Sequence, residues 1–485
     1  MKSLRNIFYY SILLTVWSTL GVPKPLFAED ALLVKQIQDL AGQMSRMQTM
    51  VSEMRGTIEN QGRQIVQLQE LAAAGPSGRE IGADGRDSFQ KNLESQIGDS
   101  GKWLRGLKFS GDLRLRYEGI ASPKGSNVND RNRFRFRLRF GFEKTWSDEI
   151  KAGFRLASGA RQYNPTSTTP GSIDTAGAVT TTNQTLMNNF DHKEINIDRA
   201  YATYLPRWAR SGPVEKFEMT AGKFANPFEE GSTMMIWDRD VAPEGAYERL
   251  EGKILKSERL NLGATLTGGQ MVLQEGLATG ADAQLFAVQG GLRPEWSPEG
   301  VQKPIAFKNL ASWYWFDGIT KSGNYVSAGY NPLQGQDLAA GGFKVFEVYN
   351  EVSTEFPKWK VPQVALYHDW ARNLDENALT KVTGGGQDTA WSSGMRLGKA
   401  QKKGSWEAAY EYYWIEANAS PSVFSDADLG GTNRCGSALK FYYALSDAMN
   451  VGTSMFFMDR LLQSDTSWGT DQRRDTYQID LNWKF

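Results

Sequence analysis

Arginine alternates with an apolar residue across residues 133–142 of this chain. The charged positions are Arg133, Arg135, Arg137 and Arg139, and the apolar ones are Phe134, Phe136, Leu138, Phe140 and Phe142. Successive side chains of an extended strand point to opposite faces, so this pattern predicts a strand with one charged and one apolar face. Residues 107–118 repeat the pattern. Such strands fit a soluble sheet with a buried apolar face, or a membrane barrel with that face in lipid and the charges in a wet lumen.

The end of the chain distinguishes between these two folds. Tyr477, Ile479, Leu481, Trp483 and Phe485 alternate with polar residues up to the last position. A final amphipathic strand that ends in Phe resembles the signal that the barrel assembly machinery reads in Gram-negative outer-membrane proteins. We therefore predict an all-β fold, a transmembrane antiparallel β-barrel, with the assembly machinery as a partner. The predicted assembly signal consists of Tyr477, Trp483 and Phe485.

Residues 1–28 are predicted to be a cleaved secretory signal peptide. Lys2 and Arg5 precede an apolar run over 7–20, and a cleavage site is available at 26–28. The alternative is an uncleaved anchor, but the apolar run is shorter than the ~20 residues that span a bilayer. The signal peptide predicts export, here to the outer membrane of a Gram-negative bacterium.

Residues 29–73 are predicted to form a coiled-coil helix. Apolar residues recur from Leu33 to Ala72 in alternating steps of four and three, the spacing that keeps one stripe against a partner helix. An amphipathic helix packed on its own domain is the alternative interpretation. Residues 74–106 are predicted to be a flexible glycine-rich linker. The helix is therefore expected in the periplasm, and the outer-membrane barrel over 107–485.

The barrel region is predicted to contain about sixteen strands. They are expected at 107–118, 131–146, 149–158, 195–205, 215–224, 245–256, 259–272, 282–292, 305–317, 341–356, 361–372, 388–398, 404–416, 432–445, 448–461 and 472–485. Short connections such as 146–148 and 445–447 alternate with longer ones such as 159–194 and 318–340. This alternation is typical of outer-membrane barrels, which have short periplasmic turns and longer outer loops.

With these segments in place, residues 107–485 resemble the sixteen-stranded trimeric porins, and the helical prefix is similar to that of a porin family carrying an N-terminal coiled coil. The resemblance implies passive diffusion of small hydrophilic solutes and ions through a water-filled lumen. It also implies a homotrimer in contact with outer-membrane lipid and lipopolysaccharide, in which loop 159–194 latches a neighbouring subunit. It further implies that the third outer loop, 225–244, narrows the lumen. The acids expected at this constriction are Glu229, Glu230, Asp238 and Asp240.

The polar faces of the expected strands predict two charged walls in the lumen. The pore-lining basic residues are expected to be Arg114, Arg116, Arg133, Arg135, Arg137, Arg139 and Arg155. The acids expected on the opposite wall are Glu347, Glu351 and Glu355. Such walls would create a transverse field that orients polar solutes, with a modest preference for anions. The alternative interpretation is structural, with the arginines pairing with loop acids to hold the loop in place.

Other function classes have little support in the sequence. Cys435 is the single cysteine, and His192 and His368 are the two histidines, so metal binding or catalysis by these residue types is not expected. We expect no cofactor, no metal and no enzyme activity. Without residues 1–28, acids outnumber bases by three, which argues against a nucleic-acid partner. A substrate-specific channel stays open as an alternative, as does a structural tether in which the coiled coil binds peptidoglycan.

Overall fold

The computed structural model describes residues 106–121, 130–159, 180–187, 189–190, 192–231, 233–274, 282–319, 343–356, 363–375, 387–462 and 473–485. The predicted signal peptide, the coiled-coil helix and all but the last residue of the linker lie outside these ranges. No helix in the described ranges is long and apolar enough to cross a membrane.

The described chain is built almost entirely from antiparallel strands. In chain order they are β1 (Leu107–Ala121), β2 (Arg131–Thr145), β3 (Ile150–Ser158), β4 (Gln184–Thr185), β5 (Ile195–Tyr204), β6 (Val214–Lys223), β7 (Glu244–Lys256), β8 (Leu260–Gln274), β9 (Ala283–Trp296), β10 (Ile305–Asp317), β11 (Phe343–Glu355), β12 (Gln363–Asn373), β13 (Thr389–Gly398), β14 (Trp406–Ile415), β15 (Arg434–Ala444), β16 (Met449–Arg460) and β17 (Arg473–Lys484). Among the described residues, short 3-10 helices lie in the connections at η2 (Arg207–Ala209), η3 (Glu229–Gly231) and η5 (Ser422–Phe424).

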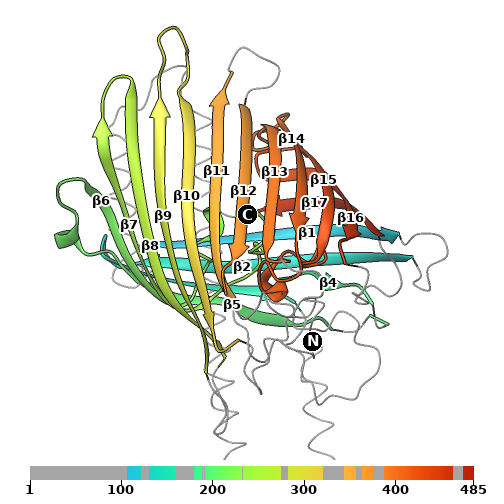
Figure 1. The fold of residues 1–485 in the computed structure, drawn as a ribbon. Helices are drawn as coiled ribbons and strands as arrows, with labels where there is room; N and C mark the ends of the chain where they lie inside the picture. Colours follow the sequence, from blue (N-terminus) through green and yellow to red (C-terminus); the bar gives the residue numbers. More distant parts are fainter. Residues whose placement is uncertain are drawn as a thin grey trace, which may run out of the picture. The chain divides into compact units, whose positions relative to one another are not determined.

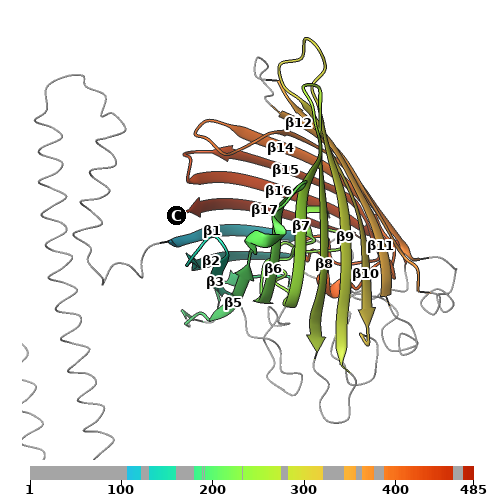
Figure 2. The same ribbon diagram turned by 90° about the vertical axis from the view of Figure 1, so that its left-hand side faces the viewer.

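Sixteen of the described strands close into a ring (Figure 1). Each long strand pairs with its neighbours in chain order, and β1 pairs with both β2 and β17. Figure 2 shows β1 beside β17, where the ring closes near the C-terminus. The predicted barrel is therefore confirmed, with strand bounds within a few residues of those expected. The two-residue β4 was not predicted; it lies within the 159–194 connection and pairs with β2.

The outer surface of the ring is apolar, as the alternation predicts for a barrel that faces lipid. Phe134 is 62% exposed, Ile197 59% and Leu266 54%. Burying one large apolar side chain stabilises a protein by roughly 1.5–3 kcal/mol relative to leaving it in water. A soluble protein would therefore not expose so many of them. Further exposed apolar side chains occur on strands all around the ring and include Phe109, Phe140, Phe142, Met219, Leu250, Phe286, Leu292, Trp315, Leu366, Met395, Leu439, Phe441, Ile479 and Leu481.

The C-terminal residue lies in the seam between β1 and β17. The Gly111 backbone N–H donates to the Phe485 carbonyl at 2.9 Å, and the Phe485 N–H donates to the Gly111 carbonyl at 3.0 Å. A Cβ atom at Gly111 would lie 2.4 Å from the Phe485 ring. Tyr477, Trp483 and Phe485 are all exposed on the final strand segment. Their recognition by the assembly machinery stays a prediction.

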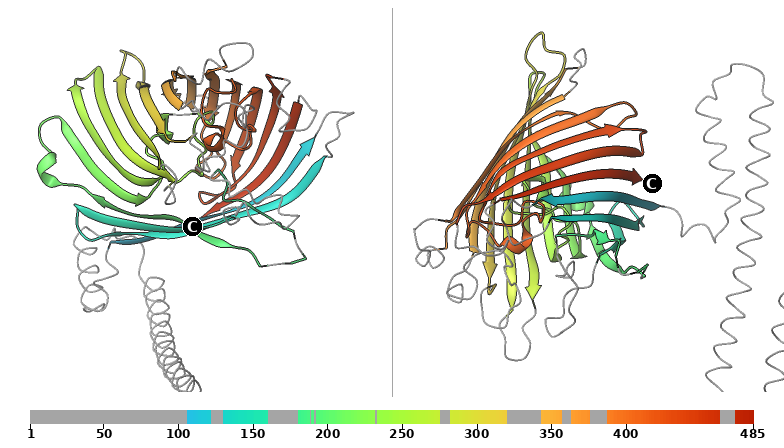
Figure 3. Two further views of the ribbon diagram at one scale, coloured as in Figure 1. Left: turned by 60° about the horizontal axis from the view of Figure 1, so that its bottom comes forward. Right: turned by 90° about the vertical axis from the view of Figure 1, so that its right-hand side faces the viewer.

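Short and long connections alternate around the ring, as expected. In the described part of the chain, two of the long connections enter the ring (Figure 3). We call the third long connection L3 (224–243, between β6 and β7) and the seventh L7 (416–433, between β14 and β15); the second, L2 (159–194), contains β4. The apolar side chains of L3 and L7 form one buried cluster with inner-face residues of β8–β16.

Candidate functional site

L3 is attached to the inner face of the barrel wall by both apolar and polar contacts. The Trp237 ring centroid lies 5.4 Å from that of Tyr314 on β10. The backbone N–H and the hydroxyl of Thr233 each donate to an Asp369 carboxylate oxygen at 2.8 Å. The Ser392 hydroxyl on β13 donates to the Thr233 hydroxyl at 3.1 Å. These contacts fix the course of L3 along the β10–β13 wall.

L7 lies against L3 inside the barrel. The Asp238 N–H donates to the Phe424 carbonyl at 2.7 Å, and the Asp426 N–H donates to the Met234 carbonyl at 3.0 Å. The Phe424 ring packs on Trp237 with 5.6 Å between ring centroids. The sequence predicted one loop inside the lumen, at 225–244. The apolar residues of L7 were the signal in the sequence for a second loop inside the lumen. In a loop that faces water, such side chains would stay exposed.

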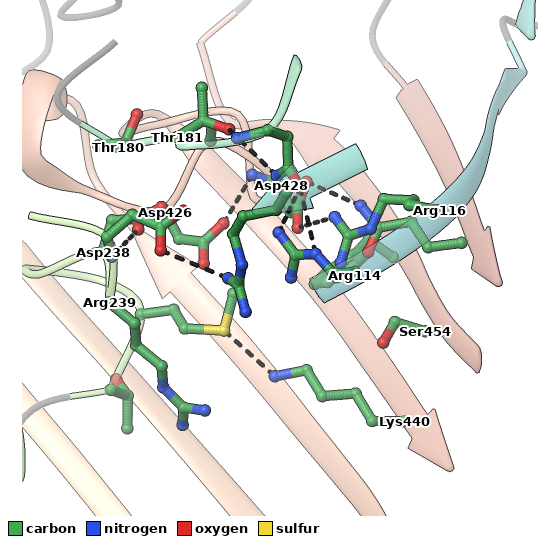
Figure 4. A pocket seen from close by; sticks show the side chains of 18 of the residues that line it. Arg114, Arg116, Thr180, Thr181, Asp238, Arg239, Asp426, Asp428, Lys440 and Ser454 are labelled. Atoms are coloured by element: carbon green, nitrogen blue, oxygen red, sulfur yellow. Dashed lines mark hydrogen bonds and ion pairs between the residues drawn. The ribbon is translucent and has the colours of Figure 1, made fainter. Parts of the chain in front are cut away.

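A cavity of about 750 Å³ remains between the two loops and the β1–β3 and β14–β17 walls (Figure 4). All seven arginines predicted to line the pore line this cavity. Five arginines that the prediction did not include also line it, namely Arg131, Arg199, Arg239, Arg396 and Arg474. Arg199 follows Asp198 on a strand with a bulge, and Arg239 follows Asp238 in a loop. In neither place does the alternation of a regular strand predict the direction of the side chain.

Arg116 connects three parts of the barrel. Its Nε and Nη2 donate to the two carboxylate oxygens of Asp480 on β17 at 2.7 and 2.8 Å. Its Nη1 lies 3.4 Å from an Asp428 oxygen on L7. The Asp428 carboxylate also accepts from the Gln478 side-chain amide at 2.8 Å. The tip of L7 is therefore joined to the arginine wall.

Asp240 makes the corresponding connection for L3. Its carboxylate lies 3.1 Å from Arg139 Nη1 and 3.5 Å from Arg137 Nη1, and it accepts from the Thr182 N–H of L2 at 3.0 Å. Burial alone would raise the pKa of Asp240, but Arg137, Arg139 and Arg114 lower it to about 2. These ion pairs attach L3 to the barrel wall. This is the structural role of the arginines that the sequence allowed as an alternative to ion selectivity.

Asp238 and Asp426 lie where L3 meets L7 (Figure 4). Burial, together with the neighbouring Asp428, raises the pKa of Asp426 to about 7. Burial also raises the pKa of Asp238 well above its ordinary value, and the charges of Asp426 and Asp240 add to this. The L3–L7 contact therefore contains carboxyl groups that retain protons near neutral pH.

The two glutamates of L3 both line an adjacent cavity of about 550 Å³ beside the main one, and Glu229 also lines the main cavity. Burial raises the pKa of Glu229. The Glu230 carboxylate lies 2.9 Å from Arg249 Nη2 and 2.8 Å from Arg293 Nη2. Burial opposes ionisation of Glu230, but its bond to Arg249 and the nearby cations leave its pKa below the ordinary value.

The three acids expected on the opposite wall occupy separate environments. Glu347 points inward beneath L3, is fully buried, and accepts from the Tyr314 hydroxyl at 2.7 Å. Glu351 lines the adjacent cavity, 3.4 Å from Arg396 Nη2. Glu355, at the end of β11, lies 3.5 Å from Lys303. None of the three lines the main cavity in the described part of the chain.

Other acidic residues line the main cavity on the side opposite the arginines. Glu407 and Glu411 of β14 line it, together with Lys440 of β15. The Lys440 ammonium donates to Glu411 at 2.8 Å. The two glutamates are four residues apart on one strand and so share a face, a pattern that the sequence already contained. The lumen therefore has arginines on one side and a mixed group of acids and bases on the other.

With this geometry, the comparison with known families is decisive. A family model described as Putative porin matches residues 120–339 and 324–485. The chain belongs to this porin family. As a porin it is an outer-membrane channel protein rather than an enzyme.

Several solved structures are similar to this porin. OprB of Pseudomonas putida matches with a TM-score of 0.45 and 10% identity over 82% of this chain and 97% of its own. OmpF of Salmonella typhi, in complex with daunomycin, matches with a TM-score of 0.41 and 12% identity over 78% and 97%. A triple mutant of the Rhodopseudomonas blastica porin matches with a TM-score of 0.38 and 10% identity over 78% and 100%. The comparison with curated proteins gave no significant match.

Proposed function

We propose that this porin gives passive diffusion of small hydrophilic solutes and ions through its lumen, narrowed by L3 and, beside it, by L7. The proposal rests on one observation: a charged cavity of about 750 Å³ lies inside a closed barrel whose outer surface is apolar. Charged walls favour hydrated polar solutes and penalise apolar ones. The substrate-specific channel is the finer alternative.

We further propose that the porin assembles as a homotrimer, with L2 at the neighbouring subunit and the coiled coil of 29–73 in the periplasm. Contact with lipid and lipopolysaccharide follows from the apolar outer face. The sequence hypothesis of a tether to peptidoglycan concerns residues outside the described ranges, and no feature of the barrel favours it over diffusion.

Reconstitution of the purified full-length protein into planar bilayers tests the proposal. We expect stepwise increases in KCl current, each of one channel unit. A variant in which 418–431 is replaced by a short Gly-Ser turn should give larger steps, because the L7 tip that joins the arginine wall is gone. Heat-denatured protein is the control. Folded protein that inserts without raising the current would refute the proposal.

A further inference from the structure

The strand β5 contains a bulge that places two charged residues in succession toward the lumen. Arg155 of β3 pairs with Arg199, whereas the next residue, Leu156, pairs with Ile197, so Asp198 is the extra residue. Asp198 is buried against Arg155, and Arg199 lines the main cavity. A regular strand would turn one of these two neighbours toward lipid. Bulges of this kind re-aim side chains and are frequent beside functional sites.

The bulge leaves two arginines sharing one carboxylate. Arg155 Nε is ion-paired with Asp198, and Arg199 Nε lies 3.8 Å from the same oxygen. Like charges directly opposite each other on neighbouring strands are destabilising. In addition, Arg155 Nη2 and Arg199 Nε are buried and have no hydrogen-bond acceptor among the described residues. Both the charge and the hydrogen-bonding capacity of the pair are therefore incompletely satisfied.

Arg116 and Arg139, on the same side of the cavity, are better supplied with carboxylates. Arg116 has both oxygens of Asp480 within 2.8 Å and Asp428 in addition. Arg139 lies 2.7 Å from Asp112 and 3.1 Å from Asp240. The β3–β5 pair therefore differs from Arg116 and Arg139 in its supply of carboxylates.

L3 contributes a further cation to the same cavity. The Arg239 side chain is 75% exposed within the lumen, and its nearest carboxylate oxygen belongs to Glu229, 3.9 Å from Nε. It makes no hydrogen bond to a described residue, and Figure 4 shows it extending away from Asp238 and Asp426. Glu229 lies close enough to influence both Arg239 and Arg199. It is thus the acid that would compete with an anion at this place.

We propose that Arg155 and Arg199 form a binding site for small oxyanions of the phosphate and sulfate class, with Arg239 as an additional cation. A guanidinium group presents two parallel N–H donors that match two oxygens of one oxyanion, a geometry that a halide cannot use. The anion would supply the missing negative charge beside Asp198. The inference rests on the proposed function, since solutes must enter the lumen to reach the site.

Block of chloride current by inorganic phosphate tests the proposal. In KCl, millimolar phosphate should reduce the wild-type current reversibly. Arg199→Gln should raise the half-blocking phosphate concentration about tenfold. Arg199→Lys keeps the charge but loses the two-donor edge, so it should raise that concentration by a smaller factor. Glu229→Gln should lower it, because the competing carboxylate is gone.

The matched control is Arg249→Gln, which removes the same charge from a lumenal arginine that already has Glu230 at 2.9 Å and Glu251 at 2.8 Å. It should leave the half-blocking concentration unchanged. If Arg199→Gln folds poorly, Arg199→Lys and Glu229→Gln still decide, since they predict opposite shifts. Phosphate block that neither of them alters would overturn the site.

Equilibrium dialysis of radiolabelled phosphate against detergent-solubilised protein separates this inference from the proposed function. Binding that Arg199→Gln weakens would support the site even if no conductance were seen. A conducting channel that neither binds phosphate nor is blocked by it would refute the site and leave the porin function intact.

Discussion

At the seam between β1 and β17, the Phe485 ring occupies the space that a side chain at position 111 would need. A Cβ atom there would lie 2.4 Å from the ring and 2.7 Å from the Arg139 carbonyl oxygen. Gly111→Val should therefore destabilise the barrel by about 1–3 kcal/mol, the usual cost of overpacking. The midpoint of urea unfolding in detergent, or the temperature at which the folded band disappears in gel electrophoresis, measures this.

Gly268→Val is the control, because a Cβ atom at Gly268 meets no atom within 4 Å. It should leave the midpoint nearly unchanged. Equal effects of the two substitutions would show that Phe485 does not hold the seam.

The inward direction of single side chains could be predicted, but their partners could not. Alternation along one strand depends only on the local backbone. The arginines that it assigned to the polar face, from Arg114 to Arg155, line the cavity. Arg116, in contrast, pairs with Asp480, which is 364 residues away. The number of carboxylate partners of each arginine depends on such distant pairs and on the bulge at Asp198. A local sequence pattern predicts neither of them.

At the scale of elements, strands were more predictable than loops. Each strand has its own alternation, whereas the inward course of L7 depends on its contact with L3 through Phe424 and Trp237. Glu347 illustrates the consequence. Its inward direction was predictable, but the loop that covers it and removes it from the cavity was not.

Labelling of β2 tests the two faces of a strand. In a Cys435→Ser background, single cysteines along 133–140 should react with a membrane-impermeant thiol reagent at the odd-numbered positions, which face the lumen. Even-numbered positions should not react in intact membranes, because they face lipid. Strong reaction at positions 134 and 140 would contradict the proposed orientation of the strand.

The contact between L3 and L7 should weaken as the pH rises. Burial gives Asp426 a pKa of about 7 in the folded protein, above the ordinary value of 3.8. Protonation therefore favours the contact, whose stabilisation is complete below about pH 4 and is lost as the pH rises through about 7. The groups facing Asp426 are Asp428 of L7, Asp238 and Arg239 of L3, and Lys440 of β15.

Amide hydrogen exchange of 233–241 and 421–430 measures this effect. Corrected for intrinsic rates, wild-type protection should fall between about pH 4 and about pH 7 and stay level above that. Asp426→Asn should keep its protection over the whole interval, because the amide does not ionise. Glu258→Gln, on an exposed turn, should behave like wild type. Protection that stays constant in the wild type would exclude the carboxyl pair as the cause.

For the molecule as a whole, we expect a trimer that the coiled coil strengthens without being its only cause. The apolar stripe from Leu33 to Ala72 needs a partner helix, and the barrel presents an apolar outer face. Native mass measurement and crosslinking should show trimers for the full-length protein and weaker trimers after deletion of 29–106. Leu40→Asp, on the stripe, should imitate the deletion, whereas Gln43→Asp, off the stripe, should not. A monomeric full-length protein would contradict this prediction.

The charge balance of the whole lumen predicts a modest preference for anions. Acids close to the arginine wall offset much of its charge, and Asp238 and Asp426 carry less negative charge near neutral pH than their number implies. Arg114 and Arg239 are among the cavity arginines that lack a close carboxylate oxygen in the described part of the chain. Arg114 hydrogen-bonds to the neutral Asn183 side chain at 2.6 Å, and Arg239 has its nearest carboxylate oxygen at 3.9 Å.

Because the Debye length is ~8 Å at physiological salt, an ion in the narrow lumen should sense these two charges before they are screened. In a KCl gradient, the wild-type reversal potential should have the sign of an anion-selective channel. Arg114→Gln combined with Arg239→Gln should shift it toward zero, and so should a rise in pH that ionises Asp238 and Asp426. Arg207→Gln with Arg259→Gln removes the same charge from exposed turns and should have little effect. Cation selectivity in the wild type, or a double variant indistinguishable from it, would mean that the arginines hold the loops and do not filter ions.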